Sequence, residues 1–291
     1  MDTDRSPHWF LSHYQARPLL AARDAAQDQA RTSLDLGRSQ ATVSLTVAGV
    51  LLPGDCILTW AQVEAVAADE NSCFLCLPSG DARVELEKIQ RFSERFNRVY
   101  TLYPTPGPPT MLISGIPMHR IKGADPGQDT RSKLRAVGRI TGPVLDTSTG
   151  LGYTAIAAAR SGHPVVTVEL DPTVLDICRL NPWSEELFSL PNVEQRIGDS
   201  GEVVETLADD FFAVVIHDPP MFNLAGHLYG TAFYRGLWRV LRPGGRLYHY
   251  IGNPESRSGR NVTQGVLRRL AEAGFVQVKR RPDAFGVTAR K

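Results

Sequence analysis

The chain has 291 residues, a hydrophobic content of 42% and a formal net charge of +1 at pH 7. This length allows one large domain or two modest ones, and the hydrophobic fraction is sufficient for an ordinary buried core. The near-neutral charge excludes a strong overall positive field of the kind that draws proteins to nucleic acid or anionic membranes, but a local basic patch is compatible with it.

The sequence predicts a cytoplasmic protein without a membrane segment or a bound metal. No apolar run reaches the length of a membrane span, and residues 1–6 lack the features of a signal peptide. The cysteines Cys56, Cys73, Cys76 and Cys178 form no disulfide framework. Cys73 and Cys76 have the spacing of half a zinc site, but no second pair of ligands follows nearby. We therefore expect structural thiols.

The first 122 residues predict small elements ahead of a larger domain. Residues 1–30 are rich in alanine and charge after an aromatic start, which indicates an N-terminal helical segment. Residues 31–122 contain short β-like runs separated by turn signals, so we expect a small β-rich domain. The Pro-rich segment 104–109 is too rigid for a helix or a central strand and is predicted to be a connector. Residues 123–291 then form the predicted catalytic domain.

Strand-like and helix-like segments alternate from Val144 onward, which is typical of a parallel sheet covered on both faces. Strands are expected at 144–146, 165–169, 194–197, 212–217 and 246–251, and helices at 125–137, 153–161, 172–179, 203–207, 232–240 and 262–273. Short strands at 276–279 and 285–289 are close enough for a C-terminal antiparallel hairpin. The predicted fold class is α/β, with a mostly parallel Rossmann-like sheet and this hairpin, preceded by the small β-rich domain.

Acidic residues follow each of the first four strands of the predicted parallel sheet. Ligands of open parallel sheets bind beyond the carboxyl ends of the strands, so these side chains are expected to line one rim. The residues expected to bind a cofactor there are Asp146, Thr147, Gly150, Gly152, Glu169, Asp171, Asp199, Ser200 and Asp218. Solvation alone does not explain four acids in order along one rim, so their placement predicts a binding site.

The glycine spacing after the first of these strands does not identify the ligand by itself. Gly150-Leu-Gly152-x-x-Ala155 fits a dinucleotide fingerprint, with Glu169 at the end of the second strand. Asp146, however, lies where the pyrophosphate of a nicotinamide dinucleotide would bring further negative charge. S-adenosyl-L-methionine carries a sulfonium and an ammonium beside an adenosine, so we predict it as the cofactor.

The arrangement of acids and glycines resembles that of the class I S-adenosylmethionine-dependent methyltransferases, over residues 134–291. The resemblance implies that Asp146 lies near the methionine moiety and that the two glycines let the backbone approach the cofactor. It also implies that Glu169 accepts hydrogen bonds from the ribose hydroxyls and that Asp199 holds the adenine amino group. The usual glycine two positions after the first acid is Ser148 here. The strings 145–155, 217–220 and 249–254 resemble a group of predicted methyltransferases best known from archaea.

Residues 218–222, Asp-Pro-Pro-Met-Phe, are the most informative for the acceptor. In methyltransferases that act on exocyclic amino nitrogens, Asp or Asn is followed by two prolines and an aromatic residue, and the carboxylate and the first proline's carbonyl accept the two hydrogens of the amine. This chain has Met221 at the aromatic position and Phe222 one residue later, so either Phe222 stacks on the acceptor ring or the acceptor is not a planar base. We expect catalytic roles for Asp218, Pro219 and Phe222, and a role of His249 on the acceptor side. A stiff strand-end turn and a hydrogen-bonded scaffolding histidine are the structural alternatives.

The predicted function is a methyltransferase, a transferase that methylates an amino nitrogen of a small molecule or of a nucleotide base in RNA. The alternative is an aminopropyltransferase similar to the spermidine synthases, in which a decarboxylated cofactor donates its propylamine arm to a polyamine. These enzymes share the domain layout, and acids along the rim suit a polycation. The doubled proline after Asp218 favours methyl transfer, whereas Asp146 disfavours a nicotinamide-dependent oxidoreductase. A non-enzymatic scaffold would be expected to lose the strand-end acids. No oligomeric state is predicted.

Overall fold

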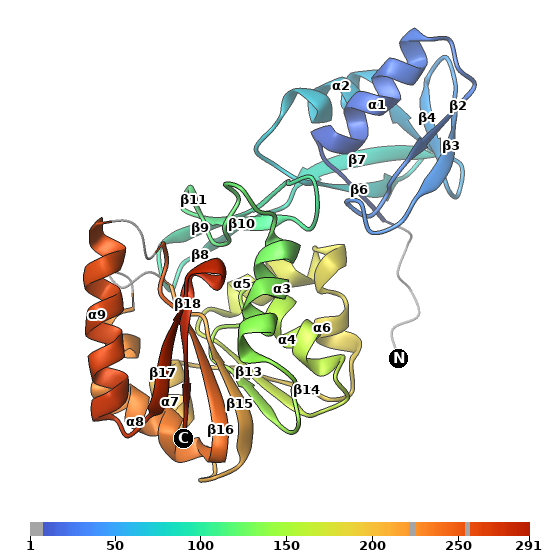
Figure 1. The fold of residues 1–291 in the computed structure, drawn as a ribbon. Helices are drawn as coiled ribbons and strands as arrows, with labels where there is room; N and C mark the ends of the chain where they lie inside the picture. The colour runs from blue at the N-terminus through green and yellow to red at the C-terminus, as the bar shows by residue number, and fades with distance from the viewer. Residues whose placement is uncertain (1–7, 221–224, 254–256) are drawn as a thin grey trace. The chain divides into compact units, whose positions relative to one another are not determined.

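The computed structural model describes residues 8–220, 225–253 and 257–291. The chain consists of two compact units: a first unit, Met1–Pro126 with Asp176–Glu185, and a second unit, Gly127–Leu175 with Glu186–Lys291 (Figure 1). The predicted division into 1–30, 31–122 and 123–291 stays a prediction.

The first unit contains a seven-stranded sheet with the order β1-β6-β7-β5-β4-β3-β2 and a four-stranded sheet with the order β11-β10-β9-β8. The strands are β1 Trp9–Leu11, β2 Gln29–Thr32, β3 Ala41–Leu45, β4 Gly49–Leu52, β5 Cys56–Thr59, β6 Phe74–Ser79, β7 Arg83–Lys88, β8 Gln90–Ser93, β9 Arg98–Tyr103, β10 Thr110–Ile113 and β11 Ile116–Pro117. The Pro-rich segment 104–109 joins β9 to β10, which are antiparallel neighbours in the smaller sheet.

Two helices, α1 (His13–Asp24) and α2 (Trp60–Ala68), pack on the larger sheet of the first unit (Figure 1). Helix α1 begins at Ser12, which forms a capping box with Gln15. Leu19 of α1 is buried in the same hydrophobic cluster as Val50 and Leu58 of the sheet. The N-terminal helical segment therefore shares its core with the β-rich part of this unit.

The second unit is built on a seven-stranded sheet with the order β14-β13-β12-β15-β16-β18-β17. Its strands are β12 Val144–Asp146, β13 Val165–Glu169, β14 Val193–Ile197, β15 Phe212–His217, β16 Leu241–Tyr250, β17 Val276–Arg281 and β18 Gly286–Arg290. The first five are parallel neighbours, and β18 pairs antiparallel with both β16 and β17. This sheet confirms the predicted α/β Rossmann-like class. All six residues of β15 are buried, as expected for a central strand covered on both faces.

Helices cover both faces of this sheet. From residue 126 onward, the α-helices are α3 Pro126–Val137, α4 Tyr153–Ala159, α5 Pro172–Arg179, α6 Glu186–Ser189, α7 Ser200–Glu205, α8 Thr231–Val240 and α9 Arg257–Glu272, and the 3-10 helices are η1 Pro182–Ser184, η2 Gly226–Tyr229 and η3 Pro282–Ala284. Helices α7, α8 and α9 pack on one face, where Val204, Leu237 and Leu270 are buried in one cluster. Helices α3 and α4 lie on the other face (Figure 1).

The described residues hold no helix that is long and apolar enough to cross a bilayer. They also hold no group of three or more side chains placed to bind a metal ion. None of the four cysteines is in a disulfide, and all four are buried. Burial raises the pKa of the Cys76 thiol to about 12 and also raises the pKa of Cys73, so both are protonated core side chains at neutral pH.

Candidate active site

Asp146 ends β12 and is completely buried. Its Oδ2 accepts hydrogen bonds from the hydroxyls of Thr154, at 3.2 Å, and Thr167, at 3.1 Å. Its Oδ1 makes no hydrogen bond with the described residues. Burial, together with the negative charge of Asp218, raises the pKa of Asp146 to about 7. A cation that binds beside Asp146 would therefore lower this pKa and favour the ionised carboxylate.

The loop after β12 closes onto the carboxylate of Glu169. Gly150 and Gly152 have φ values of +51° and +78°, a conformation that glycine adopts without strain, whereas Ser148 is outside this left-handed region. The backbone N–H of Gly150 donates to Glu169 Oε2 at 3.0 Å, and the N–H of Asp171 donates to Oε1 at 3.1 Å. Burial raises the pKa of Glu169 to about 7 against these hydrogen bonds. Serine at position 148 is thus compatible with the loop.

The third acid of the rim, Asp199, serves as the N-cap of α7. Its Oδ1 accepts from the backbone N–H of Gly201 at 2.7 Å, and its Oδ2 lies 2.9 Å from His227 Nε2. The next residue, Ser200, donates its hydroxyl to the carbonyl of Thr147 at 2.5 Å. This hydrogen bond joins the residues that follow β12 and β14, and both Thr147 and Ser200 are among the predicted cofactor-binding residues.

Asp218, at the end of β15, forms a buried ion pair that the sequence does not reveal. Lys133 of α3 lies with its Nζ 2.5 Å from Asp218 Oδ2 and 2.7 Å from Asp129 Oδ2. The same ammonium lies 4.8 Å from the ring centroid of Tyr250, at the end of β16. The side chains of Lys133 and Asp129 are 3% and 1% exposed, whereas that of Asp218 is 19% exposed. We call Lys133, Asp129 and Asp218 the Lys133 trio. Asp218 is the carboxylate of this trio that a ligand can reach.

The Lys133 ammonium stays charged in this setting. Burial alone would lower the pKa of Lys133, but the neighbouring charges of Asp218 and Asp129 outweigh burial and raise it above its usual value. For Asp218, burial raises the pKa against the opposing effect of Lys133. Two carboxylates and an aromatic face thus enclose one alkylammonium group. This is a coordination that an amine ligand also favours.

The two strand-end histidines are buried and neutral. Burial lowers the pKa of His217 to about 3 and that of His249 well below its usual value. His217 Nδ1 lies 2.7 Å from the hydroxyl of Thr147, and its Nε2 lies 3.0 Å from the carbonyl of Leu228. His249 Nε2 lies 2.9 Å from the hydroxyl of Tyr234. Both rings are therefore engaged within the protein, and this geometry favours a structural role over a catalytic one.

Another predicted site residue, Pro219, directly follows Asp218 after the end of β15. Pro219 is buried beside Asp218, and the carbonyl of Pro220 accepts a hydrogen bond from the hydroxyl of Tyr229 at 3.1 Å. Phe222, for which a catalytic role is predicted, is outside the described residues. The structure thus brings Asp146, Glu169, Asp199 and Asp218 to one edge of the sheet. It adds the Lys133 trio.

The second unit is therefore an α/β unit with a Rossmann-like sheet and a carboxylate cluster beyond its strands. The chain resembles a spermidine synthase solved in complex with the transition state analogue AdoDATO, with a TM-score of 0.59 and 18% identity over 72% of this chain and 76% of that one. It also resembles the spermidine synthase of Thermotoga maritima, with a TM-score of 0.55 and 17% identity over 71% of this chain and 74% of that one. Identities this low show a shared fold alone.

Sequence comparison places the chain in a family. No protein-family profile matches it. It is 50% identical to the uncharacterized protein MJ1233 of Methanocaldococcus jannaschii over 197 residues, and this aligned region covers 67% of this chain and 68% of that protein. The chain belongs to the same family as this relative. It is also 34% identical to the polyamine aminopropyltransferase of Nitrosomonas europaea over 98 residues, and this aligned region covers 32% of this chain and 30% of that protein.

These comparisons contradict the predicted methyltransferase function. The relative with a stated activity is a polyamine aminopropyltransferase, and the structural neighbours are spermidine synthases. The predictions of a methyl-transferring enzyme and of S-adenosyl-L-methionine as its cofactor are wrong on the same findings. The error came from the two prolines after Asp218, because they stiffen a strand-end turn whichever group is transferred.

Proposed function

We propose that this protein is an aminopropyltransferase, which transfers the aminopropyl group of decarboxylated S-adenosylmethionine to a primary amine of a diamine or polyamine. The observation that carries the proposal is the Lys133 ammonium held between Asp129 and Asp218 over the ring of Tyr250. The two carboxylates and the ring give the ammonium of this internal lysine the contacts that an alkylammonium substrate requires. The partial match to a polyamine aminopropyltransferase supports the same reaction.

The charge of the rim favours a decarboxylated donor over the intact one. Asp146 and Glu169 each have a pKa raised to about 7, so a cation that binds beside them is stabilised by restoring their ionised forms. Decarboxylated S-adenosylmethionine is cationic at both its sulfonium and its amine. The carboxylate of intact S-adenosylmethionine would instead meet like charge, and the Lys133 ammonium is already shared between two carboxylates.

The proposed transfer is a single displacement at carbon. The neutral amine nitrogen of the acceptor attacks the propyl carbon bonded to sulfur, a C–N bond forms, and the C–S bond breaks with its electron pair going to sulfur. Methylthioadenosine leaves as a neutral thioether, and so it needs no acid. An acceptor amine is protonated at neutral pH and must lose a proton, which Asp218 is placed to accept. The rest of catalysis is alignment of the two reactants.

The test is a product assay with the full-length protein. Decarboxylated S-adenosylmethionine is incubated with 1,4-diaminobutane, longer diamines or spermidine, and products are measured by mass spectrometry. We expect methylthioadenosine and an aminopropylated amine in equal amounts, and at least about tenfold tighter calorimetric binding of the decarboxylated donor than of S-adenosylmethionine. Absence of methylthioadenosine with every amine tested, although the donor binds, would reject the proposed reaction.

The role of His249 is tested separately with Tyr234→Phe, which removes the hydroxyl hydrogen-bonded to the buried His249 Nε2. We expect the free energy of unfolding to fall by about 1 to 3 kcal/mol, because a buried polar nitrogen loses its partner. Turnover should stay within a few-fold of the wild type. A loss of turnover by about 100-fold with unchanged stability would instead give His249 a catalytic role.

A further inference from the structure

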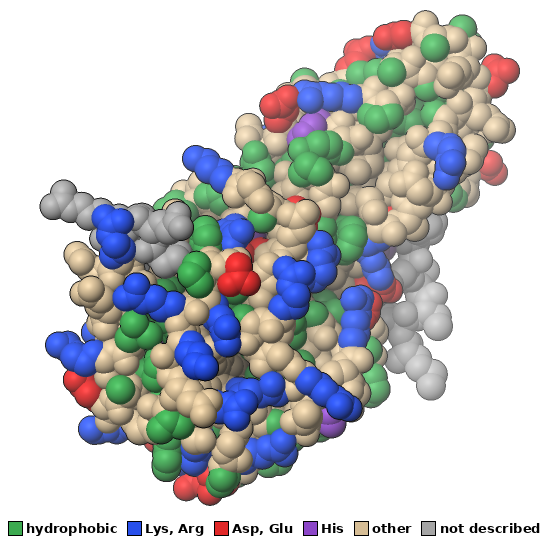
Figure 2. Space-filling model, viewed as in Figure 1, with side chains coloured by type: hydrophobic (Ala, Val, Ile, Leu, Met, Phe, Trp, Pro, Cys, Tyr) green, Lys and Arg blue, Asp and Glu red, His purple; other side chains and the backbone are tan. Residues whose placement is uncertain are grey.

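A second feature of the second unit is a cavity of about 310 Å³ that is lined by basic side chains. Figure 2 shows Lys and Arg side chains gathered on the face of this unit where Figure 1 shows β17 and β18. The basic side chains that line the cavity are Arg135, Arg246, Lys279, Arg281 and Arg290. The other described residues that line it are uncharged. We call it the basic cavity.

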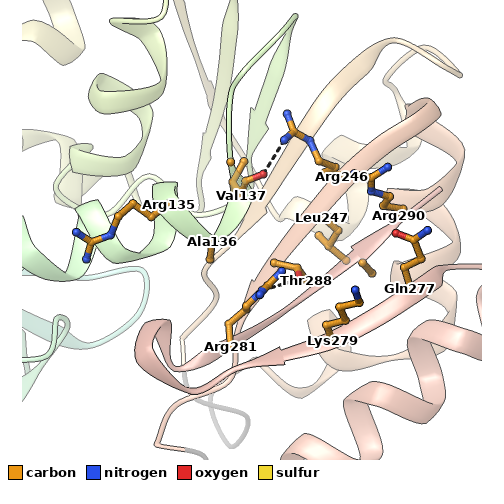
Figure 3. Close-up of a pocket in the computed structure, with 12 residues that line it drawn as sticks. Arg135, Ala136, Val137, Arg246, Leu247, Gln277, Lys279, Arg281, Thr288 and Arg290 are labelled. Carbon is orange, nitrogen blue, oxygen red and sulfur yellow. Dashed lines mark hydrogen bonds between the residues drawn. The ribbon is translucent and has the colours of Figure 1, made fainter.

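The sheet register brings these cations together. Lys279 and Arg281 are two residues apart on β17, and Arg290 is two residues after Thr288 on β18, so each pair faces the same side of the sheet. Arg246 of β16 pairs directly with Arg290, and Lys279 pairs with Thr288. Figure 3 shows Arg246, Lys279, Arg281 and Arg290 on the three strands, with the end of α3 beside them, whereas Arg135 points from α3 away from the strands.

This arrangement carries an electrostatic cost within the protein. Like charges that lie directly opposite on neighbouring strands are destabilising, as for Arg246 and Arg290. Burial lowers the pKa of Arg246, and the charges of Arg290 and Arg242 lower it further. Among the described residues, no carboxylate forms an ion pair with any of the five cations. A sheet that accepts this repulsion is expected to gain from a bound anion.

Some of these donors are used within the protein and others face no acceptor. Arg246 donates to the carbonyls of Val137, the last residue of α3, and of Arg139, two residues later. Arg281 donates to Thr288 Oγ1 at 3.1 Å. The side chains of Lys279 and Arg290 make no hydrogen bond or ion pair to the described residues, although their backbones pair within the sheet. Guanidinium groups match the oxygens of phosphate in pairs, and an ammonium adds a point charge. The basic cavity thus offers several phosphate-binding groups at once.

We propose that the basic cavity binds a small molecule with two or more phosphate groups, such as a nucleoside diphosphate or triphosphate. Its volume lies at the lower end of the range of small-molecule sites, and four of its cations lie on three neighbouring strands beside one hollow rather than forming a long stripe for a nucleic-acid backbone. The site is separate from the carboxylate cluster, because Arg246 precedes Tyr250 by four residues of extended strand, about 13 Å. The proposal therefore does not depend on aminopropyl transfer.

Calorimetric titration of the full-length protein with pyrophosphate and with ATP tests this site. We expect saturable binding of both that weakens as salt rises, and at least about tenfold weaker binding in the double variant Lys279→Gln/Arg290→Gln. The matched control is Arg268→Gln, which removes a 73% exposed cation on α9 and should leave affinity within about twofold. The double variant should unfold at the same temperature as the wild type or a higher one, because it loses like-charge repulsion.

Three results would overturn the basic cavity as a phosphate site. The first is the absence of saturable binding of either ligand, and the second is equal affinity of the wild type and the double variant. The third is binding of single-stranded RNA that strengthens with its length and is not displaced by pyrophosphate, which would assign this face to nucleic acid instead.

Discussion

Replacing Asp218 with asparagine is expected to lower aminopropyl transfer by about 10³-fold, because the acceptor ammonium then loses the base that takes its proton. Donor affinity should stay within a few-fold, since Asp218 acts on the acceptor side. The free energy of unfolding should fall by about 1 to 3 kcal/mol, less than for an isolated buried pair, because Lys133 keeps Asp129 as a partner. Single-turnover assays, calorimetry and denaturant titration measure the three quantities.

Asp129→Asn is the matched control for this variant. It also removes one carboxylate from Lys133, and its effect on stability should be similar. Asp129 is only 1% exposed, however, so a substrate amine does not reach it, and turnover should fall by no more than about tenfold. Equal losses of turnover in the two variants would show that Asp218 acts only through the ion pair, and the role of Asp218 as base would then be rejected.

Asp146→Asn is expected to stabilise the unliganded protein at pH 8 and to abolish tight donor binding. The folded pKa of Asp146 is about 7, against 3.8 in the unfolded chain. A raised carboxyl pKa stabilises the folded state most below pH 3.8, and this stabilisation is lost as pH rises to 7. The difference of about 3 pKa units corresponds to about 4 kcal/mol at most. Asparagine mimics the protonated form and should recover part of this energy at pH 8.

Donor binding gives the second measurement on Asp146. In the wild type, decarboxylated S-adenosylmethionine should bind more tightly as pH rises through 7 and should release a proton, which calorimetry in two buffers counts. In Asp146→Asn, affinity should fall by about 100-fold, and the contribution of this group to the pH dependence should vanish. A variant that is less stable than the wild type at pH 8 would contradict the assignment. So would wild-type affinity that does not change between pH 6 and 8.

Strands with strong apolar runs were predictable to the residue. The segments 144–146, 165–169 and 212–217 are β12, β13 and β15, because β-branched runs bounded by proline, glycine or aspartate leave little choice of ends. The helix expected at 203–207 begins at Ser200 instead, since Asp199 caps it through the N–H of Gly201. That cap is a local signal that the sequence contains.

The start of β16 shows where local signals mislead. The strand predicted at 246–251 runs from Leu241 to Tyr250 and so includes Arg-Pro-Gly-Gly, residues that are typical of a turn. Leu241 pairs with Phe212, and the register with β15 shifts before Arg246 pairs with Val214. Pairing with a distant strand therefore takes the segment into the sheet in spite of its turn residues. Periodicity within the segment does not contain this information.

The acids of the site were predictable because each one ends a strand, but their cationic partner was not. Asp129 and Lys133 are four residues apart on α3, a spacing that in sequence is typical of a solvent-exposed ion pair. Their burial depends on how α3 packs against the ends of β15 and β16, which no pattern in residues 126–137 specifies. The roles expected for Glu169 and Asp199 in holding the nucleoside stay predictions.

The Lys133 ammonium has a consequence for how the proposed enzyme responds to substrate concentration. A tethered group competes with free ligand at an effective concentration of roughly millimolar order. An acceptor amine that binds Asp218 must displace the Lys133 ammonium from it, so an amine that binds weakly or is dilute leaves the ion pair between Lys133 and Asp218 intact. The trio therefore sets a concentration threshold for the acceptor, and the KM for the amine rather than for the donor reports its strength.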